Sequence, residues 1–484
     1  MINSIIWLNR IKWSFVHGLG QQLPVLASFL VVARFVDPGS FGIMAIAWVV
    51  AGFGQIFLLD TIGDALIREQ KLDDDILNST FWLSLLLGLF LALLTAGSAG
   101  SAAWVFGDSR LRLLLQILSL RLVFDALAIV PDALLRQPYA LRSLAVRNVV
   151  ANGAASVVAI IAAVEGFGVW ALVAQQVMLG AANAATAWGA VSWRPSFRLF
   201  RPDARIWHYF AVSSGYRAIQ FTSANLDCLL IQSFLGPTML GYYSVAQRVK
   251  GFSMDFIAGN AMRLIALPLF SESRIDREVL RRAYLKSLST LTLVTIPCFG
   301  GLATVAPVLI TTVFGPKWTP AVVIIQILSL QAIMEVISQM NSTLLRAAGK
   351  ASWWLGVNFT SFVLGIALIM KFNFSLTAVA LAVCGREFLL LPLHMGMVRR
   401  VCGITVLDYV RIILPPAAAT LFMVTVIVMV ERDLNTSLPQ VMATATAALL
   451  GASAYFGAIY CLSGLVRETA GTLVLAFWNR HDAT

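Results

Sequence analysis

Long apolar segments separated by short polar ones run through almost the whole chain. Most hold about 20 residues or more, the length that a helix needs to cross the hydrocarbon core of a bilayer. Backbone groups cannot stay unpaired in hydrocarbon, so these segments must be helices rather than open strands. The pattern predicts an all-α polytopic membrane protein with about fourteen transmembrane helices. The predicted spans are 13–34, 40–63, 77–104, 112–133, 146–164, 167–191, 208–233, 240–268, 284–314, 320–344, 352–371, 374–397, 410–430 and 438–463.

Short motifs recur in the same order in the two halves of the chain. QILSL begins at residues 116 and 326, an acidic residue follows nine positions later (Asp125, Glu335), and LLR closes both segments. VFG occurs at 105–107 and 313–315, and FVDPGSFG at 35–42 is matched by FLGPTMLG at 234–241. These matches pair span 4 with span 10, so the repeat unit has six helices. An even number makes the two repeats parallel, and substrates bind between such repeats in transporters.

The distribution of basic residues predicts the orientation. The chain is 59% hydrophobic and 12% charged, with a mean hydropathy of +0.82, and its net charge of +11 does not indicate a nucleic-acid partner. The basic residues instead gather on one side. With a cytoplasmic N-terminus, 23 of the 35 Lys and Arg residues fall in cytoplasmic segments and 6 in outside segments. This agrees with the positive-inside rule, and both termini are predicted to be cytoplasmic.

The predicted organisation has five parts. They are an interfacial N-terminal segment (1–12), an N-lobe of spans 1–6 (13–204), a C-lobe of spans 7–12 (205–400), spans 13 and 14 (401–463), and an amphipathic cytoplasmic tail (464–484). The N-terminal segment is too polar for a cleaved signal peptide and lacks a small-residue cleavage site. No predicted loop exceeds roughly twenty residues, which leaves no room for a soluble catalytic domain.

Ionisable residues inside the spans are functional candidates, because an uncompensated charge at the bilayer centre costs at least ~2.5–3.5 kcal/mol. The basic candidates, which would line a cationic substrate cavity, are Arg217, Arg248, Arg121, Lys250 and Arg386. The candidates for ion coupling or charge balance are Asp227, Asp255, Glu335, Asp125 and His17.

Helix spacing separates some of these candidates. Arg121 and Asp125 are four residues apart and can form an ion pair, which leaves a structural pair and a cavity-lining role equally open. Gln331 takes the place of Arg121 in the second half, so Glu335 lacks that partner on its own helix. Arg386 is followed directly by Glu387; adjacent residues face different directions, and at least one should point into the protein interior.

The remaining candidates are less constrained. Arg217 has no acidic residue three or four positions away, which favours exposure to a cavity. Arg248 and Asp255 are seven residues apart and share one face of span 8, while Lys250 points elsewhere. His17 lies on the same face of span 1 as a nearby glutamine, where a packed polar seam is favoured over a proton site.

No enzyme motif is present. The sequence holds no Walker-type phosphate loop, no HExxH and no GxSxG, and its four histidines are dispersed, so no metal site is predicted. The five cysteines show no ligand spacing, and no disulfide is predicted. Without an ATP site, transport would be driven by an ion gradient or by the substrate gradient itself. We therefore predict no cofactor and no enzymatic activity, with H⁺ or Na⁺ open as a coupling ion.

Three segments resemble a known family. Residues 53–88 (FGQIFLLDTIGDALIREQKLDDDILNSTFWLSLLLG), 166–176 (GFGVWALVAQQ) and 225–248 (NLDCLLIQSFLGPTMLGYYSVAQR) are similar to the Wzx-type polysaccharide-export flippases of the MOP exporter superfamily. The resemblance covers roughly residues 1–400. It implies two six-helix lobes forming a V-shaped cavity, two additional C-terminal helices, and transport by alternating access in the bacterial inner membrane.

The resemblance also implies a substrate class. Its members move oligosaccharide units on a polyprenyl-pyrophosphate carrier to the outer leaflet, for exopolysaccharide or lipopolysaccharide O-antigen synthesis. A pyrophosphate needs cations, and the forked donors of Arg match phosphate oxygens. Arg217 and Arg248 are expected to hold the pyrophosphate or an acidic sugar, while Asp227, Asp255 or Glu335 balances charge or couples a cation.

Two alternatives and the partners complete the prediction. A cation-coupled multidrug exporter of the same superfamily would be poorly served by a net-basic cavity. A membrane polysaccharide polymerase or ligase would need an extended periplasmic loop, and none is present among the predicted loops.

The expected partners are the lipid-linked glycan, the bilayer, and the polymerase and glycosyltransferases of the same pathway. A monomer is expected, because no dimer-forming GxxxG face stands out.

Overall fold

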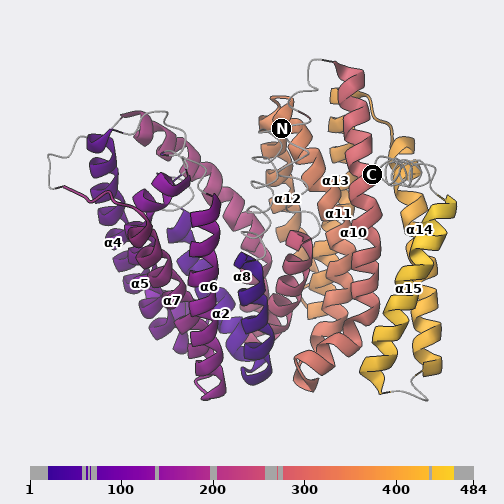
Figure 1. The fold of residues 1–484 in the computed structure, drawn as a ribbon, viewed down its shortest axis with the longest axis horizontal. Coiled ribbons are helices and arrows are strands. Elements are labelled where there is room, and N and C mark those ends of the chain that lie inside the picture. Colours follow the sequence, from indigo (N-terminus) through magenta and orange to yellow (C-terminus); the bar gives the residue numbers. More distant parts are fainter. Residues whose placement is uncertain are drawn as a thin grey trace, which may run out of the picture. The chain divides into compact units, whose positions relative to one another are not determined.

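The computed structural model describes residues 20–56, 62–63, 66, 73–136, 141–196, 204–256, 270, 276–434 and 439–462. The regular secondary structure in these ranges is helical throughout, as predicted (Figure 1). The predicted interfacial segment 1–12, His17 and the tail 464–484 lie outside the described residues.

The helices follow the predicted spans closely. Residues 20–35 are helical. The following helices in the N-terminal half are α2 (Pro38–Gln55), α4 (Asp74–Val105), α5 (Arg110–Arg136), α6 (Leu141–Val164), α7 (Val169–Ala190) and α8 (Ala204–Met254). Those in the C-terminal half are α10 (Arg277–Val313), the 3₁₀ helix η4 (Pro316–Trp318), α11 (Thr319–Ala347), α12 (Ala351–Lys371), α13 (Leu376–Cys402), α14 (Val406–Leu434) and α15 (Gln440–Leu462).

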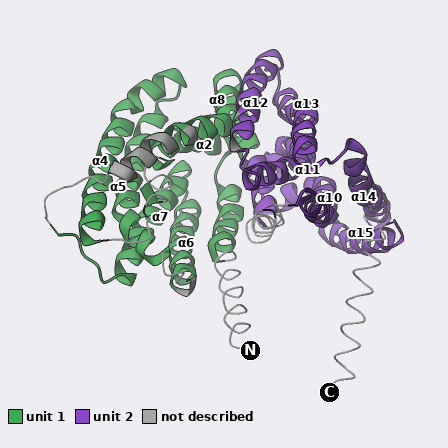
Figure 2. Cartoon of the chain, turned by 90° about the horizontal axis from the view of Figure 1, so that it is seen from above, with its two compact units in different colours: residues 1–244 green, residues 245–484 purple. Residues whose placement is uncertain are grey.

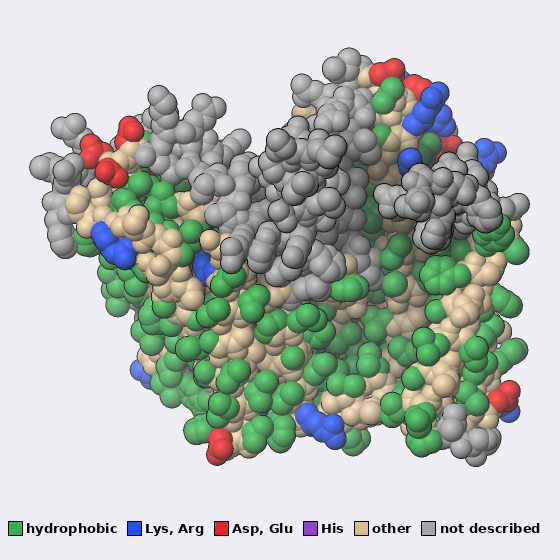
Figure 3. All heavy atoms as spheres, viewed as in Figure 1, with side chains coloured by type: hydrophobic (Ala, Val, Ile, Leu, Met, Phe, Trp, Pro, Cys, Tyr) green, Lys and Arg blue, Asp and Glu red, His purple; other side chains and the backbone are tan. Residues whose placement is uncertain are grey.

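Ten of the described helices are long and apolar enough to cross a membrane, and they correspond to predicted spans 2–5 and 9–14. Span 6 is present as α7, and spans 7 and 8 run together in α8 across a break at Gly236, whose φ is 81°. Large apolar side chains such as Leu93 (73% exposed) and Leu449 (71% exposed) lie on the surface. Apolar side chains cover the middle of the visible face of each unit, with the charged ones toward the ends (Figure 3). A surface of this kind suits lipid; the full count of fourteen spans stays a prediction.

Shared local chemistry explains helix boundaries in both halves of the duplication. Gly107 and Gly315 end the two VFG motifs and adopt φ values of 68° and 97°, which residues other than glycine rarely adopt.

The start of α2 is fixed by a side-chain cap. Asp37 accepts hydrogen bonds from the backbone N–H and the hydroxyl of Ser40, at 2.9 and 2.7 Å. Burial opposes ionisation of this carboxyl, but the Ser40 hydrogen bonds and the Arg110 charge outweigh it and lower the pKa of Asp37.

The chain divides into two compact units, Met1–Ser244 and Val245–Thr484 (Figure 2). The division falls within α8 rather than at the predicted 204/205 boundary, so all of predicted span 7 and the first residues of span 8 belong to unit 1. Contacts with α2 explain this placement, since Phe53 packs edge-on against Phe221 with ring centroids 5.2 Å apart. The predicted lobe boundaries themselves stay a prediction.

The same helix pairs pack in each unit, at the offset that the sequence motifs indicated. In unit 1, α5 packs against α4 and α7, and α6 packs against α7. In unit 2, α11 packs against α10 and α13, and α12 packs against α13. Adding 210 residues carries α4, α5, α6 and α7 onto α10, α11, α12 and α13. The internal duplication is therefore also a duplication of packing.

The two related motifs FVDPGSFG and FLGPTMLG contact each other within unit 1. A Cβ on Gly42 would lie 1.8 Å from the carbonyl oxygen of Pro237, and a Cβ on Gly241 would lie 1.8 Å from that of Pro38. Each glycine follows the proline of its own motif by four residues, so the contact is reciprocal. Only glycine at positions 42 and 241 permits the backbones of the two motifs to approach this closely.

Candidate functional site

A buried acidic residue on α5 is the centre of a polar cluster in unit 1. Asp125 is 4% exposed. Its Oδ2 accepts a hydrogen bond from Gln55 Nε2 at 2.9 Å and lies 3.5 Å from Arg121 Nε. Arg121 also donates to the side-chain carbonyl of Gln176 on α7. We call Gln55, Arg121, Asp125 and Gln176 the N-cluster; it joins α2, α5 and α7.

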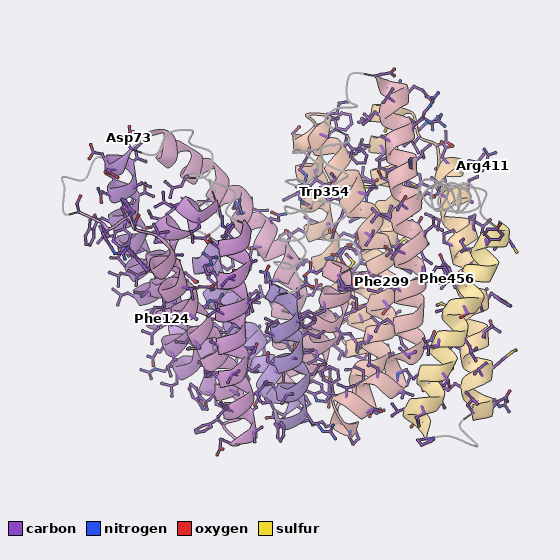
Figure 4. The ribbon with its side chains drawn as sticks, viewed as in Figure 1. Asp73, Phe124, Phe299, Trp354, Arg411 and Phe456 are labelled. Atoms are coloured by element: carbon purple, nitrogen blue, oxygen red, sulfur yellow. The ribbon has the colours of Figure 1, made fainter. Side chains whose placement is uncertain are left out.

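Small residues allow these three helices to approach one another. A Cβ on Gly54 would lie 2.9 Å from the Leu122 side chain, and a Cβ on Gly180 would lie 3.1 Å from Arg121 Cγ. These glycines bring the backbones of α2 and α7 close to α5, which places the polar side chains within hydrogen-bonding distance. Phe124, which directly precedes Asp125, lies well away from Asp73 at the start of α4 (Figure 4). The acidic residue of the N-cluster is itself buried among the helices of unit 1.

A second cluster surrounds the equivalent acidic residue in unit 2. Lys250 Nζ lies 3.0 Å from Glu335 Oε2 and 3.3 Å from Gln331 Oε1. Gln339 Nε2 donates to the other carboxylate oxygen of Glu335 at 3.4 Å. On α13, Arg386 Nη2 lies 3.5 Å from Glu387 Oε1, and Glu387 interacts electrostatically with Glu335 and Lys250. The C-cluster is the set Lys250, Gln331, Glu335, Gln339, Arg386 and Glu387.

The two clusters are related by the duplication, with one exchange. Arg121 corresponds to Gln331, and Gln176 corresponds to Arg386, each pair being 210 residues apart. The arginine and the glutamine have therefore swapped helices between the two copies. In both copies the acid also receives a donor from the helical segment that starts at the proline of FVDPGSFG or FLGPTMLG, namely Gln55 in unit 1 and Lys250 in unit 2.

Each cluster balances its formal charges. The N-cluster has one cation and one anion, and the C-cluster has Lys250 and Arg386 against Glu335 and Glu387. Ions removed from water are tolerated when they are paired and hydrogen-bonded. The sequence alone had paired only Arg121 with Asp125, and it missed Gln55, Gln176 and Gln339 as partners. Aligning the two halves at an offset of 210 residues would have revealed that Arg386 occupies the position of Gln176, and therefore that the arginine and the glutamine have changed helices.

One expectation about neighbouring residues was wrong. Arg386 and Glu387 were expected to face different directions, but their charged groups meet and their side chains are only 10% and 13% exposed. Both side chains are long enough to bend toward each other although their Cα–Cβ bonds diverge. Both therefore lie in the interior of unit 2.

The other predicted candidates lie along α8. Arg217 is half-buried, and Arg248 is half-buried with its guanidinium 5.9 Å from the centre of the Phe252 ring. Asp227 is 4% exposed and accepts a hydrogen bond from the Tyr243 hydroxyl at 2.9 Å. Asp255 is exposed, near the end of the described part of this segment. A role for these four residues in binding or coupling stays a prediction.

Two further buried polar groups anchor helices in unit 2. Tyr284 on α10 and Tyr409 on α14 both donate to the Asn341 side-chain carbonyl on α11, and the two hydroxyls lie 2.7 Å apart. This arrangement attaches α14, which is outside the duplication, to two helices of the repeat. His394 Nδ1 lies 3.0 Å from Ser338 Oγ, and its ring packs against Trp354 with centroids 5.4 Å apart.

Comparison with known proteins agrees with this architecture. A family model described as polysaccharide biosynthesis protein matches residues 31–323. The teichuronic acid biosynthesis protein TuaB of Bacillus subtilis is 27% identical over 302 residues, which are 62% of this chain and 62% of that relative. The succinoglycan biosynthesis transport protein ExoT of Rhizobium meliloti is 23% identical over 357 residues, covering 73% of this chain and 72% of the relative.

A solved structure shows the same fold. The lipid II flippase MurJ in an inward closed conformation matches 92% of this chain and 99% of its own, with a TM-score of 0.71 and 15% sequence identity. Identity at this level establishes the fold alone. With this fold, the ten apolar helices of membrane-spanning length and these relatives, the chain is a multi-pass helical membrane protein.

Proposed function

Because the chain belongs to the polysaccharide biosynthesis protein family, we propose that it is a flippase for lipid-linked glycans. It carries oligosaccharide units on polyprenyl pyrophosphate from the cytoplasmic to the outer leaflet of the bacterial inner membrane, for exopolysaccharide or O-antigen synthesis. The observation that carries the proposal is the family match over residues 31–323, which extends from the helix before α2 into α11 and includes the central acidic residue of the N-cluster.

The charged residues within the helices support a transport mechanism. A pyrophosphate diester that crosses a bilayer needs cations along its route, because an unpaired charge in hydrocarbon is costly. Arg121, Lys250 and Arg386 are held inside helix bundles by acidic partners, and Arg217 and Arg248 lie on α8. Alternating access of the two repeats would present these cations first to the cytoplasm and then to the outside. H⁺ and Na⁺ are both open as the coupling ion.

The proposed protein transfers its substrate without making or breaking a bond. Its partners are the lipid-linked glycan and the enzymes that synthesise and polymerise it, and it acts as a monomer. A polymerase or ligase would instead form glycosidic bonds on units that have already crossed the membrane. The sidedness of the accumulated intermediate separates these two functions.

The test is deletion of the gene followed by a sidedness assay. We expect surface polysaccharide to disappear and lipid-linked units to accumulate, and we expect complementation with the wild-type gene to restore export. In spheroplasts, periodate stays outside and oxidises only sugars on the outer leaflet. The accumulated sugars should be protected from periodate in intact spheroplasts and should react after lysis. Accumulated units that react before lysis, or normal export in the deletion strain, would refute the flippase.

A further inference from the structure

The two copies of the duplicated acidic site differ in how far they are exposed. The Asp125 side chain is 5% exposed and that of Arg121 is 14% exposed. The Glu335 side chain is 33% exposed, while that of its partner Lys250 is 10% exposed. A third of the Glu335 side chain is thus accessible near the middle of a membrane-spanning helix. The carboxylate of the N-cluster is closed off, although Gln55 and Gln176 beside it are half-buried, whereas the carboxylate of the C-cluster is accessible.

The helix face beside Glu335 is also more polar than the face beside Asp125. On α11, polar residues continue from Glu335 toward the cytoplasmic end through Gln339 and Thr343 to Arg346, whose Nη2 lies 3.5 Å from Thr343 Oγ1. Gln339 is exposed. Exposed polar side chains at this depth indicate contact with water rather than lipid, because hydrocarbon cannot satisfy their hydrogen bonds.

The equivalent face of α5 is apolar directly after the acid, and its next charged residue, Asp132, is bound by Arg136 and Arg147. Four and eight residues after Asp125 come Ile129 and Ala133, which are 2% and 1% exposed and belong to the hydrophobic core. The polar face therefore continues from the acid toward the predicted cytoplasmic end in the second repeat, whereas in the first repeat apolar side chains separate Asp125 from the paired Asp132. Of these two copies, the second offers a polar route by which a headgroup could reach the cluster.

The cation of each copy has chemistry that matches its surroundings. Arg121 is held by two partners, Asp125 and Gln176, and its planar guanidinium favours such a fixed geometry. Lys250 is a point charge on a flexible stem, and its ammonium can change partners by rotation of that stem. The amides of Gln331 and Gln339 lie on either side of Glu335 along α11, and Gln339 already donates to its carboxylate. This carboxylate therefore keeps a hydrogen-bond donor when the ammonium leaves.

We propose that Lys250 is a pyrophosphate-binding residue which exchanges partners during transport: Glu335 holds its charge in the empty protein, and the substrate's pyrophosphate replaces Glu335 on loading. The Arg121–Asp125 pair is the structural copy and keeps its partner throughout. This inference rests on the proposed flippase function and assigns the anionic headgroup to one cluster of unit 2. It makes Glu335 a competitor of the substrate for the Lys250 ammonium.

If Glu335 competes with the substrate for Lys250, removing either charge should change pyrophosphate binding, but in opposite directions. The full-length protein in nanodiscs would be titrated with undecaprenyl pyrophosphate, with undecaprenol as the uncharged control, and bound lipid would be counted by native mass spectrometry. Removing the cation in Lys250→Met should weaken pyrophosphate binding about tenfold, as expected for the loss of a charged hydrogen bond. Removing its competitor in Glu335→Gln should tighten binding about tenfold, and Lys250→Arg should retain binding near the wild-type level.

A purely structural ion pair would behave differently. Glu335→Gln would then weaken binding or leave it unchanged, and either result would overturn the exchange. The matched control is Asp125→Asn in the closed copy, which should not tighten binding; tightening equal to that of Glu335→Gln would also overturn it. If Lys250→Met does not fold, the sign of the Glu335→Gln shift decides. A wild-type protein that does not prefer undecaprenyl pyrophosphate to undecaprenol would instead count against the proposed function itself.

Discussion

The N-cluster predicts a large coupling between Arg121 and Asp125. Asp125→Asn removes the carboxylate that faces Arg121 Nε at 3.5 Å and leaves a buried guanidinium with the Gln176 carbonyl as its partner within the cluster. Removing one member of a buried ion pair typically costs about 3–5 kcal/mol, because the other charge stays desolvated. We expect Asp125→Asn and Arg121→Gln each to lower the free energy of unfolding by an amount of this order.

The double variant should be less harmful than the two single changes combined. With both charges removed, the two introduced amide side chains can hydrogen-bond to the neighbouring amides of the cluster. The second repeat already carries a glutamine, Gln331, at the position equivalent to Arg121. Replacing both partners of a buried pair is often close to neutral. We therefore expect a coupling free energy of about 2–4 kcal/mol between the two positions.

The assay is a double-mutant cycle on the free energy of unfolding. The four proteins would be purified in dodecyl maltoside and unfolded reversibly by increasing the mole fraction of SDS, with tryptophan fluorescence as the readout. Glu165→Gln is a suitable control, because Glu165 is exposed in the turn after α6 and its change should cost less than about 0.5 kcal/mol. A coupling below about 0.5 kcal/mol would mean that the pair is not a buried structural unit, and the reasoning would be refuted.

Two further predictions concern α2 and its surroundings. Gly42→Ala and Gly241→Ala should each lower the apparent Tm, because the added Cβ would lie 1.8 Å from a carbonyl oxygen, whereas Gly97→Ala, with no atom within 4 Å, should not; equal Tm values for all three would contradict the close backbone contact. The lowered pKa of Asp37 predicts a pH-dependent contribution. Its stabilisation is present above the ordinary pKa of Asp and is lost as the pH falls through the lower folded pKa. The Tm difference between wild type and Asp37→Asn should therefore shrink from about pH 5 to about pH 3, and a difference that is constant over this range would argue against an ionised cap.

The duplication could be predicted from the sequence because it depends on local signals. VFG precedes a turn in both halves, and the glycine in each adopts a positive φ. The spacing of four residues between Arg121 and Asp125 made an ion pair one of the two predicted alternatives, because the helical period alone brings the two side chains together. Helix identity, helix order and the even-numbered repeat follow from patterns of this kind, which need no knowledge of packing.

The composition of the polar clusters depended on tertiary packing. Lys250 and Glu335 are 85 residues apart, and Gln55 and Asp125 are 70 apart. Whether such residues meet depends on the rotation of each helix about its axis and on its depth against its neighbours. Small residues such as Gly54 and Gly180 determine the rotation and the depth of a helix, because two backbones can touch only where side chains are absent. The sequence determined which charges enter the membrane, and only the packing of the helices decided which partner each one has.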